Sequence, residues 1–219
     1  KSYYTTYIKN LLKISKDYQR SLLFGLKIAY SGIEGAYGYI AAKRMYPNCE
    51  LVSNNNFSKA LKSVEEGICD HAVLPIENSF AGDVGEVMDL IFSGSLFINS
   101  MYDLEIEHNL IAITDVNFSQ IKTVVSHPQA LAQCSNFIEQ YDFETIEEVN
   151  AAFAAKRLKE SGNKNMAVIA SKETADAYNL KIIKEKINNS KLNTTRFASF
   201  SRVMSSYKDV GASKKNFIT

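Results

Sequence analysis

Two short segments place hydroxyl, amide and charged side chains directly beside apolar strand patterns. "LPIENS" puts Glu77, Asn78 and Ser79 after an apolar run, and "NTTRF" puts Thr195 and Arg196 before an alternating one. Hydroxyls and amides donate hydrogen bonds, and a guanidinium binds carboxylates through a planar fork of donors. These residue types favour the binding of a carboxylate. The alternatives are that Glu77 only caps a helix or forms a salt bridge, and that Arg196 lies on the surface.

A third segment, "VVSHPQALAQC", ends a buried strand on Ser126 and His127 and continues at once as a helix. Ser126 is a candidate N-cap, and Pro128 suits the first helical turn, where its missing N–H costs little. His127 either contacts a ligand or makes a structural hydrogen bond, whereas His71 and His108 have the pattern of strand-edge residues. Strand ends of the same kind recur at "YSGIEGAYG", "PIENSFAGDVG" and "IASKETA".

Ligands of open parallel sheets bind beyond the carboxyl ends of the strands, where helix N-termini offer unpaired N–H groups and positive partial charge. Each of the four strand ends alone is most simply an ordinary helix cap. Together they predict an anion-binding cleft.

The elements that must position these residues alternate along the chain. Strand patterns such as "LKIAYS" and "NMAVIA" are separated by helical patterns such as "FSKALKSVEEG". This alternation predicts an α/β fold with largely parallel sheets. The β-rich segment "LFINSMYDLEIEHNLIAI" interrupts it, and we expect the chain to cross between two subdomains near 102–107 and to return near 184–191.

Composition excludes several classes of protein. The 219 residues are 46% hydrophobic and 22% charged, with a formal net charge of +1. No basic stripe or long apolar segment is evident, so we expect neither a nucleic-acid partner nor a membrane partner. Cys49, Cys69 and Cys134 are far apart, which suggests neither a disulfide framework nor a zinc site. We therefore expect a cytoplasmic protein without a zinc site.

Five segments, "GIEGAYG", "LPIENSFAGDVG", "SHPQALAQC", "NAAFAA" and "NTTRF", closely resemble the prephenate dehydratase domain in order and spacing, over about Lys27 to Arg202. The resemblance implies two Rossmann-like lobes with a central cleft, like the type II periplasmic binding proteins. It also implies the conversion of prephenate to phenylpyruvate with loss of water and carbon dioxide, toward phenylalanine. Because this reaction forms an aromatic ring, we expect it to require no metal and no cofactor. The alternatives are an arogenate dehydratase and a non-catalytic two-lobed solute-binding protein.

The resemblance implies four catalytic residues. Thr195 matches the threonine that acts on the departing hydroxyl group, and Asn78 matches an amide of the site. Gln133 matches a polar group that lines it. Glu77, Arg196 or a water is expected to stand behind Thr195, because a threonine hydroxyl is a poor acid by itself. The expected catalytic set is Thr195, Asn78, Glu77 and Gln133.

Seven further residues are expected to bind the substrate. They are Ser126, Arg196, Phe197, Ser79, Glu34, Asn150 and His127. Ala36 departs from the family pattern, which has a hydroxyl there, and the segment around Asn150 lacks two hydroxyls that the family carries. Asn150 can still cap its helix and donate hydrogen bonds.

The two ends of the chain resemble neighbouring modules. Residues 1–25 resemble the last helix of the helical chorismate mutases, with Ser15 and Gln19 on one face, although a docking helix or remnant linker is the simpler interpretation. Residues 205–219 resemble a linker to an ACT regulatory domain, so we expect phenylalanine to bind only through that missing domain.

The remaining residues are expected to form the two lobes of a homodimer or higher homo-oligomer that acts on the small molecule prephenate. The first lobe is assigned to 26–104 with 184–204, and the second to 105–183.

Overall fold

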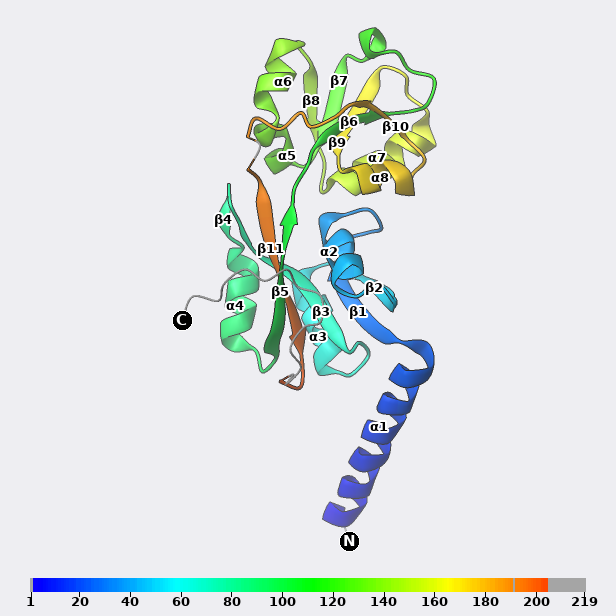
Figure 1. The fold of residues 1–219 in the computed structure, drawn as a ribbon, viewed down its shortest axis with the longest axis vertical. Helices are drawn as coiled ribbons and strands as arrows, with labels where there is room; N and C mark the ends of the chain where they lie inside the picture. Colours follow the sequence, from blue (N-terminus) through cyan, green and yellow to red (C-terminus); the bar gives the residue numbers. More distant parts are fainter. Residues whose placement is uncertain (1, 191, 205–219) are drawn as a thin grey trace.

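The computed structural model describes residues 2–190 and 192–204, which form two lobes and one projecting helix (Figure 1). The first lobe contains strands β1 (Leu26–Ser31), β2 (Cys49–Asn54), β3 (His71–Asn78), β4 (Gly82–Asp83), β5 (Phe97–Glu105) and β11 (Thr194–Ser201), and helices α2 (Tyr37–Met45), α3 (Phe57–Glu65) and α4 (Gly85–Ser93). The second lobe contains strands β6 (Asn109–Ala112), β7 (Thr123–Ser126), β8 (Glu144–Glu147), β9 (Met166–Ala170) and β10 (Lys181–Lys184), and helices η1 (Phe118–Gln120), α5 (Pro128–Gln133), α6 (Ser135–Gln140), α7 (Ala151–Ser161) and α8 (Lys172–Ala177). The expected α/β fold of two lobes with a central cleft is confirmed.

Both sheets are mixed, so the expectation of largely parallel sheets is wrong. The first sheet has the order β2-β1-β3-β11-β5, and the second has the order β10-β6-β9-β7-β8. β1 is parallel to β2 and β3, and β7 is parallel to β8 and β9. β11 is antiparallel to β3 and β5, and β6 is antiparallel to β9 and β10. A strand becomes parallel to its neighbour when a crossover connection, usually a helix, returns the chain to the same edge of the sheet. Strands β6 and β11 instead follow the segments that come from the other lobe, so they enter their sheets in the antiparallel direction.

The chain passes between the lobes at residues 106–108 and returns at 185–193. Glu105 pairs with Thr194 in the first sheet, and Lys184 pairs with Leu110 in the second. Glu105, which was predicted for the second lobe, thus belongs to the first, and Lys184, which was predicted for the first lobe, belongs to the second. Both predicted boundaries differ from the structure by one residue.

Hydrogen bonds join the two crossing segments side by side. The Ile106 N–H donates to the carbonyl of Asn193 at 2.7 Å, and the Ile187 N–H donates to the carbonyl of His108 at 2.9 Å. The side chain of Asn188 accepts from the His108 N–H at 2.7 Å. These bonds fix the backbone at the residues that connect the lobes.

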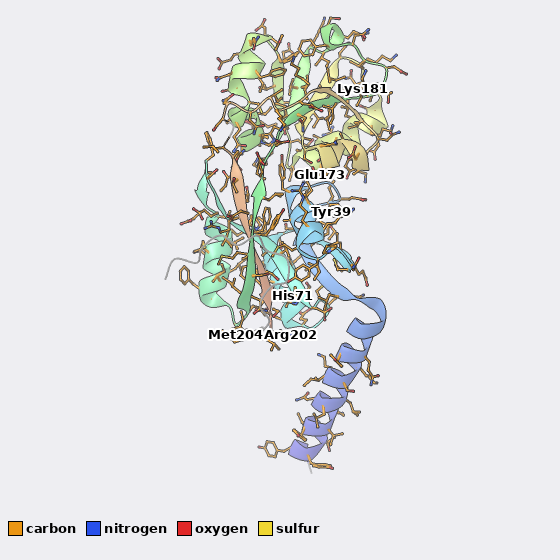
Figure 2. All side chains as sticks on the ribbon, viewed as in Figure 1. Tyr39, His71, Glu173, Lys181, Arg202 and Met204 are labelled. Atoms are coloured by element: carbon orange, nitrogen blue, oxygen red, sulfur yellow. The ribbon has the colours of Figure 1, made fainter. Side chains whose placement is uncertain are left out.

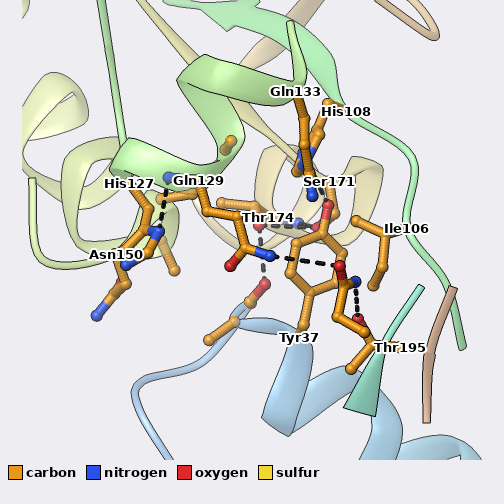
Figure 3. Close-up of a pocket in the computed structure, with 16 residues that line it drawn as sticks. Tyr37, Ile106, His108, His127, Gln129, Gln133, Asn150, Ser171, Thr174 and Thr195 are labelled. Carbon is orange, nitrogen blue, oxygen red and sulfur yellow. Dashed lines mark hydrogen bonds between the residues drawn. The ribbon is translucent and has the colours of Figure 1, made fainter. Parts of the chain in front are cut away.

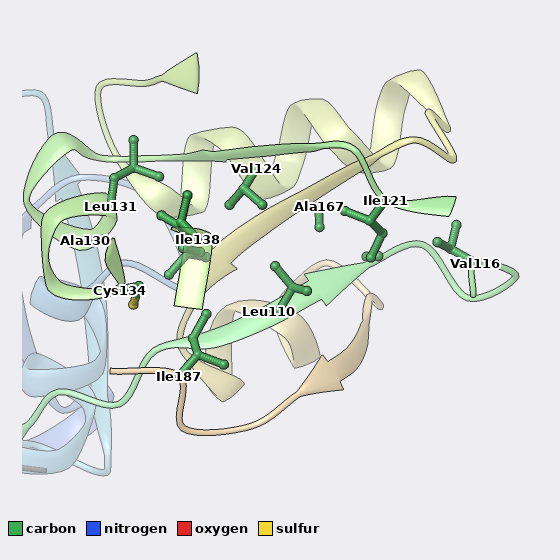
Figure 4. Packing of buried hydrophobic residues seen from close by; sticks show 12 residues of the cluster. Leu110, Val116, Ile121, Val124, Ala130, Leu131, Cys134, Ile138, Ala167 and Ile187 are labelled. Carbon is green, nitrogen blue, oxygen red and sulfur yellow. The ribbon is translucent and has the colours of Figure 1, made fainter. Parts of the chain in front are cut away.

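Apolar side chains fill both lobes. In the first lobe, successive residues of β3 point to opposite faces of the sheet: Val73 packs with Ile28 under α2, and Leu74 packs with Ala29 under α3 and α4. In the second lobe, Figure 4 shows Leu110, Val124 and Ile138 in one buried cluster. Burying these faces gives each lobe its own core.

Helix α1 (Ser2–Phe24) projects away from the first lobe (Figure 1). The Gln19 side chain donates to the Ser15 hydroxyl at 3.4 Å, as their spacing on one helix face requires. Of the residues the structure describes, no helix is both long and apolar enough to cross a membrane. The predicted linker at 205–219 lies outside the described residues.

Candidate active site

A cavity of about 160 Å³ lies between the lobes, and both lobes and one crossing segment line it (Figure 3). The first lobe and the crossing segment contribute Gly35, Ala36, Tyr37, Asn78, Thr195, Ile106 and His108. The second lobe contributes His127, Gln129, Ala130, Gln133, Asn150, Ala151, Ala152, Ser171 and Thr174. Five of the eleven predicted site residues are among them: Thr195, Asn78, Gln133, Asn150 and His127.

Helix N-termini supply most of the polar backbone at the cavity. Helices α5, α7 and α8 are capped there by His127, Asn150 and Ser171, whose side chains accept backbone N–H groups at 3.2, 2.7 and 3.0 Å. Ala36, the N-cap of helix α2, also lines the cavity but makes no side-chain cap bond. Val84, the N-cap of helix α4, does not line it. Of the four predicted strand ends, the one at Asn78 thus reaches the cavity without the helix that follows it, and α7, which was not among the four, also begins there.

The cavity is electrically unusual for an anion site. Among the described residues that line it, none is Asp, Glu, Lys or Arg. An anion bound here would therefore interact with the positive partial charge of the helix N-termini and with N–H and O–H donors, not with a cationic side chain of the described lining.

The orientation of the Asn78 amide decides what the Thr195 hydroxyl can do. Asn78 Oδ1 accepts the backbone N–H groups of Phe80 and Ala81, each at 3.0 Å. Its Nδ2 therefore donates to Thr195 Oγ1 at 2.8 Å and to Asn193 Oδ1 at 3.1 Å. Because Thr195 Oγ1 accepts this bond and no described residue accepts its proton, the hydroxyl is free to donate into the cavity.

Gln133 and His108 form the polar wall on the other side. Gln133 Oε1 accepts from Asn193 Nδ2 at 2.9 Å and lies 2.8 Å from His108 Nε2. Gln133 Nε2 is buried and has no partner among the described residues. Burial lowers the pKa of His108 below its ordinary value, and the hydrogen bond to Gln133 opposes this effect only in part.

Sequence reasoning missed His108 as a site residue. It was expected at a strand edge, but it is 2% exposed and lies between β5 and β6, where the chain enters the second lobe. Its position beside the predicted crossing near 102–107 was the one signal that pointed to the cavity. Tyr37, at 3.1 Å from His108 Nδ1, carried no such signal.

Direct contacts between the lobes close one side of the cavity. The Thr174 hydroxyl donates to the carbonyl of Gly35 at 2.8 Å, and Arg44 forms an ion pair with Glu173 at 2.6 Å. Figure 2 shows Glu173 at the boundary between the lobes. Gly35 has a φ of +85°, and a Cβ there would lie 3.2 Å from Thr174 Cα, so the close approach favours glycine.

Ser126 is not a substrate contact and not a helix cap, contrary to both expectations. Its side chain is fully buried, and its hydroxyl donates to the Ile169 carbonyl at 2.7 Å, from β7 to the neighbouring strand β9. The cap of α5 falls one residue later, on His127. The hydroxyl of Ser126 is thus used in the contact between β7 and β9, and Ser126 does not line the cavity.

Glu77 and Arg196 lie outside the cavity, although both adjoin residues that line it. Successive strand residues face opposite sides of a sheet, so Asn78 and Thr195 turn toward the cavity while Glu77 and Arg196 turn away. Arg196 Nε donates to Asp103 Oδ1 at 2.8 Å, and its Nη1 donates to Glu77 Oε2 at 3.3 Å. The hydrogen bond to Asp103 is the main cause that raises the pKa of Arg196.

Three other predicted contacts also have structural roles elsewhere. Phe197 is 2% exposed and packs in the core under α2. It lies on the same strand face as Thr195 but two residues farther from the cleft. The Ser79 hydroxyl accepts the Thr194 N–H at 3.0 Å, and the exposed carboxylate of Glu34 accepts from the Tyr39 hydroxyl at 3.2 Å.

Substituting Arg196 with alanine is expected to leave KM unchanged, because its guanidinium does not face the cavity. The exposed ion pairs should contribute about 1 kcal/mol or less to the free energy of unfolding. Steady-state kinetics and urea unfolding of Arg196→Ala check both expectations. A KM raised several-fold in a fully folded variant would restore the role in anion binding that the sequence predicted.

Comparisons with known proteins agree with this geometry. A family model described as prephenate dehydratase matches residues 28–205. The chain is 37% identical over 177 residues to arogenate dehydratase/prephenate dehydratase 2, chloroplastic, of Arabidopsis thaliana, and the aligned region covers 81% of this chain and 46% of that protein. It is 37% identical over 179 residues to arogenate dehydratase 1 of Petunia hybrida, which covers 81% and 42%. The chain thus spans about half the length of the curated relatives it matches.

Two solved structures are similar over both lobes. Prephenate dehydratase from Arthrobacter aurescens in complex with L-Phe has a TM-score of 0.78 at 26% identity, which covers 85% of this chain and 64% of that one. A protein described as a novel type of quorum quenching acylase has a TM-score of 0.76 at 29% identity, which covers 84% and 67%.

Proposed function

The chain belongs to the prephenate dehydratase family, and from this premise we propose that its cleft converts prephenate to phenylpyruvate, water and carbon dioxide. The observation that carries the proposal is the Thr195 hydroxyl, which accepts a hydrogen bond from Asn78 and so directs its own proton into the cavity. A hydroxyl held in this way can donate to the departing hydroxyl group of the substrate.

The reaction requires little chemistry from the protein. The bond between the ring carbon and its hydroxyl group breaks, and the electron pair of the bond to the ring carboxylate moves into the ring as carbon dioxide leaves. Formation of the aromatic ring supplies the driving force. The protein must donate a hydrogen bond or proton to the leaving oxygen and hold the dianion without restraining the carboxylate that departs.

The polar wall of the cavity suits the binding of that dianion. The N-termini of α2, α5, α7 and α8 open on the cavity, and Gln133 Nε2 is a buried donor that has no partner within residues 2–190 and 192–204. Donors that are fixed before the substrate arrives need no reorganisation during the reaction, and each contributes more in a site that excludes water. The absence of a cationic side chain from the described lining also leaves the departing carboxylate free of a strong ion pair.

The same lining favours prephenate over arogenate. The two substrates differ in the side chain, where prephenate has a keto group and arogenate has an ammonium group. A keto oxygen accepts hydrogen bonds, whereas an ammonium group requires acceptors and is costly to bury without a counter-ion. No carboxylate is present among the described lining residues, and the helix N-termini repel a cation.

Incubating the purified chain with each substrate, and following phenylpyruvate and phenylalanine separately, tests the proposal. The kcat/KM for prephenate is expected to exceed that for arogenate by about tenfold or more, since an unpaired buried ion costs about 1–3 kcal/mol or more. Preference for arogenate would contradict the substrate assignment, and turnover of neither would contradict the proposed reaction.

A further inference from the structure

Six side chains form a continuous hydrogen-bonded chain across the cavity. The order is Thr195, Asn78, Asn193, Gln133, His108 and Tyr37. This series of hydrogen bonds begins on β3 and β11 in the first lobe, passes through both crossing segments and α5, and ends on α2. It therefore links the first lobe, both crossing segments and helix α5 of the second lobe.

The donor and acceptor of every bond between Asn78 and His108 are determined by the orientation of the Asn78 amide. The backbone N–H groups of Phe80 and Ala81 hold Asn78 Oδ1, so Asn78 Nδ2 must donate to Asn193 Oδ1. Asn193 is then left with Nδ2 toward Gln133, and Gln133 must present its oxygen to accept it. Rotating the Gln133 amide by half a turn would set two N–H donors against each other.

His108 must then carry its proton on Nε2. That nitrogen lies 2.8 Å from Gln133 Oε1, an acceptor, so it can bond there only as a donor. In the neutral ring Nδ1 is then an acceptor, and it lies 3.1 Å from the Tyr37 hydroxyl, whose single proton is shared between this nitrogen and the carbonyl of Glu107, also at 3.1 Å. Backbone bonds on both sides of His108, to Asn188 and from Ile187, hold the ring in place.

We propose that His108 is a positioning residue whose Nε2–H locks the Gln133 amide, so that Gln133 Nε2 faces the cavity as a donor to the substrate. With this lock, the Gln133 amide and the Thr195 hydroxyl each direct toward the cavity a proton that no described residue accepts. The identity of the acceptor, an oxygen of prephenate, rests on the proposed function. The lock itself depends only on the geometry of the protein.

Kinetics of three His108 variants test the lock. His108→Leu removes the donor and is expected to raise KM about tenfold with a smaller change in kcat, because a substrate contact present in ground and transition states alike acts on KM. His108→Gln, which places an amide N–H near the same point, should recover most of the loss. In a Gln133→Leu background, His108→Leu should raise KM no further.

His71 provides the matched control. It is also a partly buried histidine, bonded to Tyr46 and Ser199, but it lies at the end of the first lobe far from the cleft (Figure 2). His71→Leu is expected to leave KM unchanged in the folded protein. An unchanged KM in His108→Leu, or an equal rise in the Gln133→Leu background, would overturn the proposal.

A spectroscopic measurement tests the lock without turnover. Nitrogen NMR of the chain with labelled histidine should show His108, identified by its loss in His108→Gln, as the neutral form protonated on Nε2 at pH 7. A proton on Nδ1 would overturn the proposal. Failure of the unsubstituted chain to turn over either substrate would instead count against the proposed function, so the two failures are distinguishable.

Discussion

Thr195→Val is expected to lower kcat and kcat/KM together by about 10²-fold or more while KM changes little, since removing one preorganised donor costs about 3 kcal/mol. Valine is nearly isosteric with threonine, so the cavity keeps its shape and loses the hydroxyl group. The Asn78 amide then loses its acceptor on Thr195 but keeps Asn193 and the loop backbone as partners. The effect should therefore fall on the chemical step rather than on binding.

Thr194 is the internal control for this measurement. It is the preceding residue of β11 and does not line the cavity. Its backbone N–H donates to the Ser79 hydroxyl, and its carbonyl accepts from the Ser79 N–H. Thr194→Val should keep kcat and KM close to those of the unsubstituted chain. A Thr195→Val enzyme with near-normal kcat would show that the departing hydroxyl group is assisted from elsewhere.

Phe197→Ala is expected to destabilise the folded chain by about 3–5 kcal/mol, the usual cost of removing a large buried side chain and leaving a cavity. The ring is 2% exposed and packs with Ile28, Val73 and Leu104 beneath α2. Urea unfolding measures the change directly. Enzyme that remains folded should bind substrate with an unchanged KM, because Phe197 does not touch the cavity.

Phe92 is a suitable control because it is 83% exposed on α4. Phe92→Ala should change the free energy of unfolding by about 0.5 kcal/mol or less. The interpretation of Phe197 as a core residue would be wrong if Phe197→Ala kept normal stability and raised KM, which is the behaviour of a substrate contact.

The local pattern of the sequence was sufficient for the elements themselves. The apolar runs that predicted strands at "LKIAYS", before the end of "LPIENS" and at "NMAVIA" correspond to β1, β3 and β9. The helical pattern after "SHPQ" was also correct in type, although it divides at Cys134 into α5 and α6. Hydrophobic periodicity acts over a few residues, so it is visible without any knowledge of the partners.

The faces of the strands were the main source of error at the site. Glu77 and Arg196 adjoin Asn78 and Thr195 in sequence, and a motif does not state which residues of a strand point into a cleft. Pairing in the first sheet turns these two side chains to the opposite face, where they form an ion pair with each other. Phe197 was misassigned for a related reason. It lies on the same face of β11 as Thr195, but the sequence does not show how far along the strand the cleft extends, and Phe197 lies beyond it in the core.

The sequence by itself determined the chemistry available: a hydroxyl and an amide at strand ends in the spacing of a known family, with capping residues ahead of several helices. Only the tertiary structure decided which groups meet. Asn78 and Thr195 are 117 residues apart and bond because β3 pairs with β11. His108 and Gln133 meet because the chain crosses between the lobes beside α5. Hydrogen bonds depend on distance and direction in space, so contacts between residues far apart in the chain, and the protons they fix, exist only once the lobes have folded.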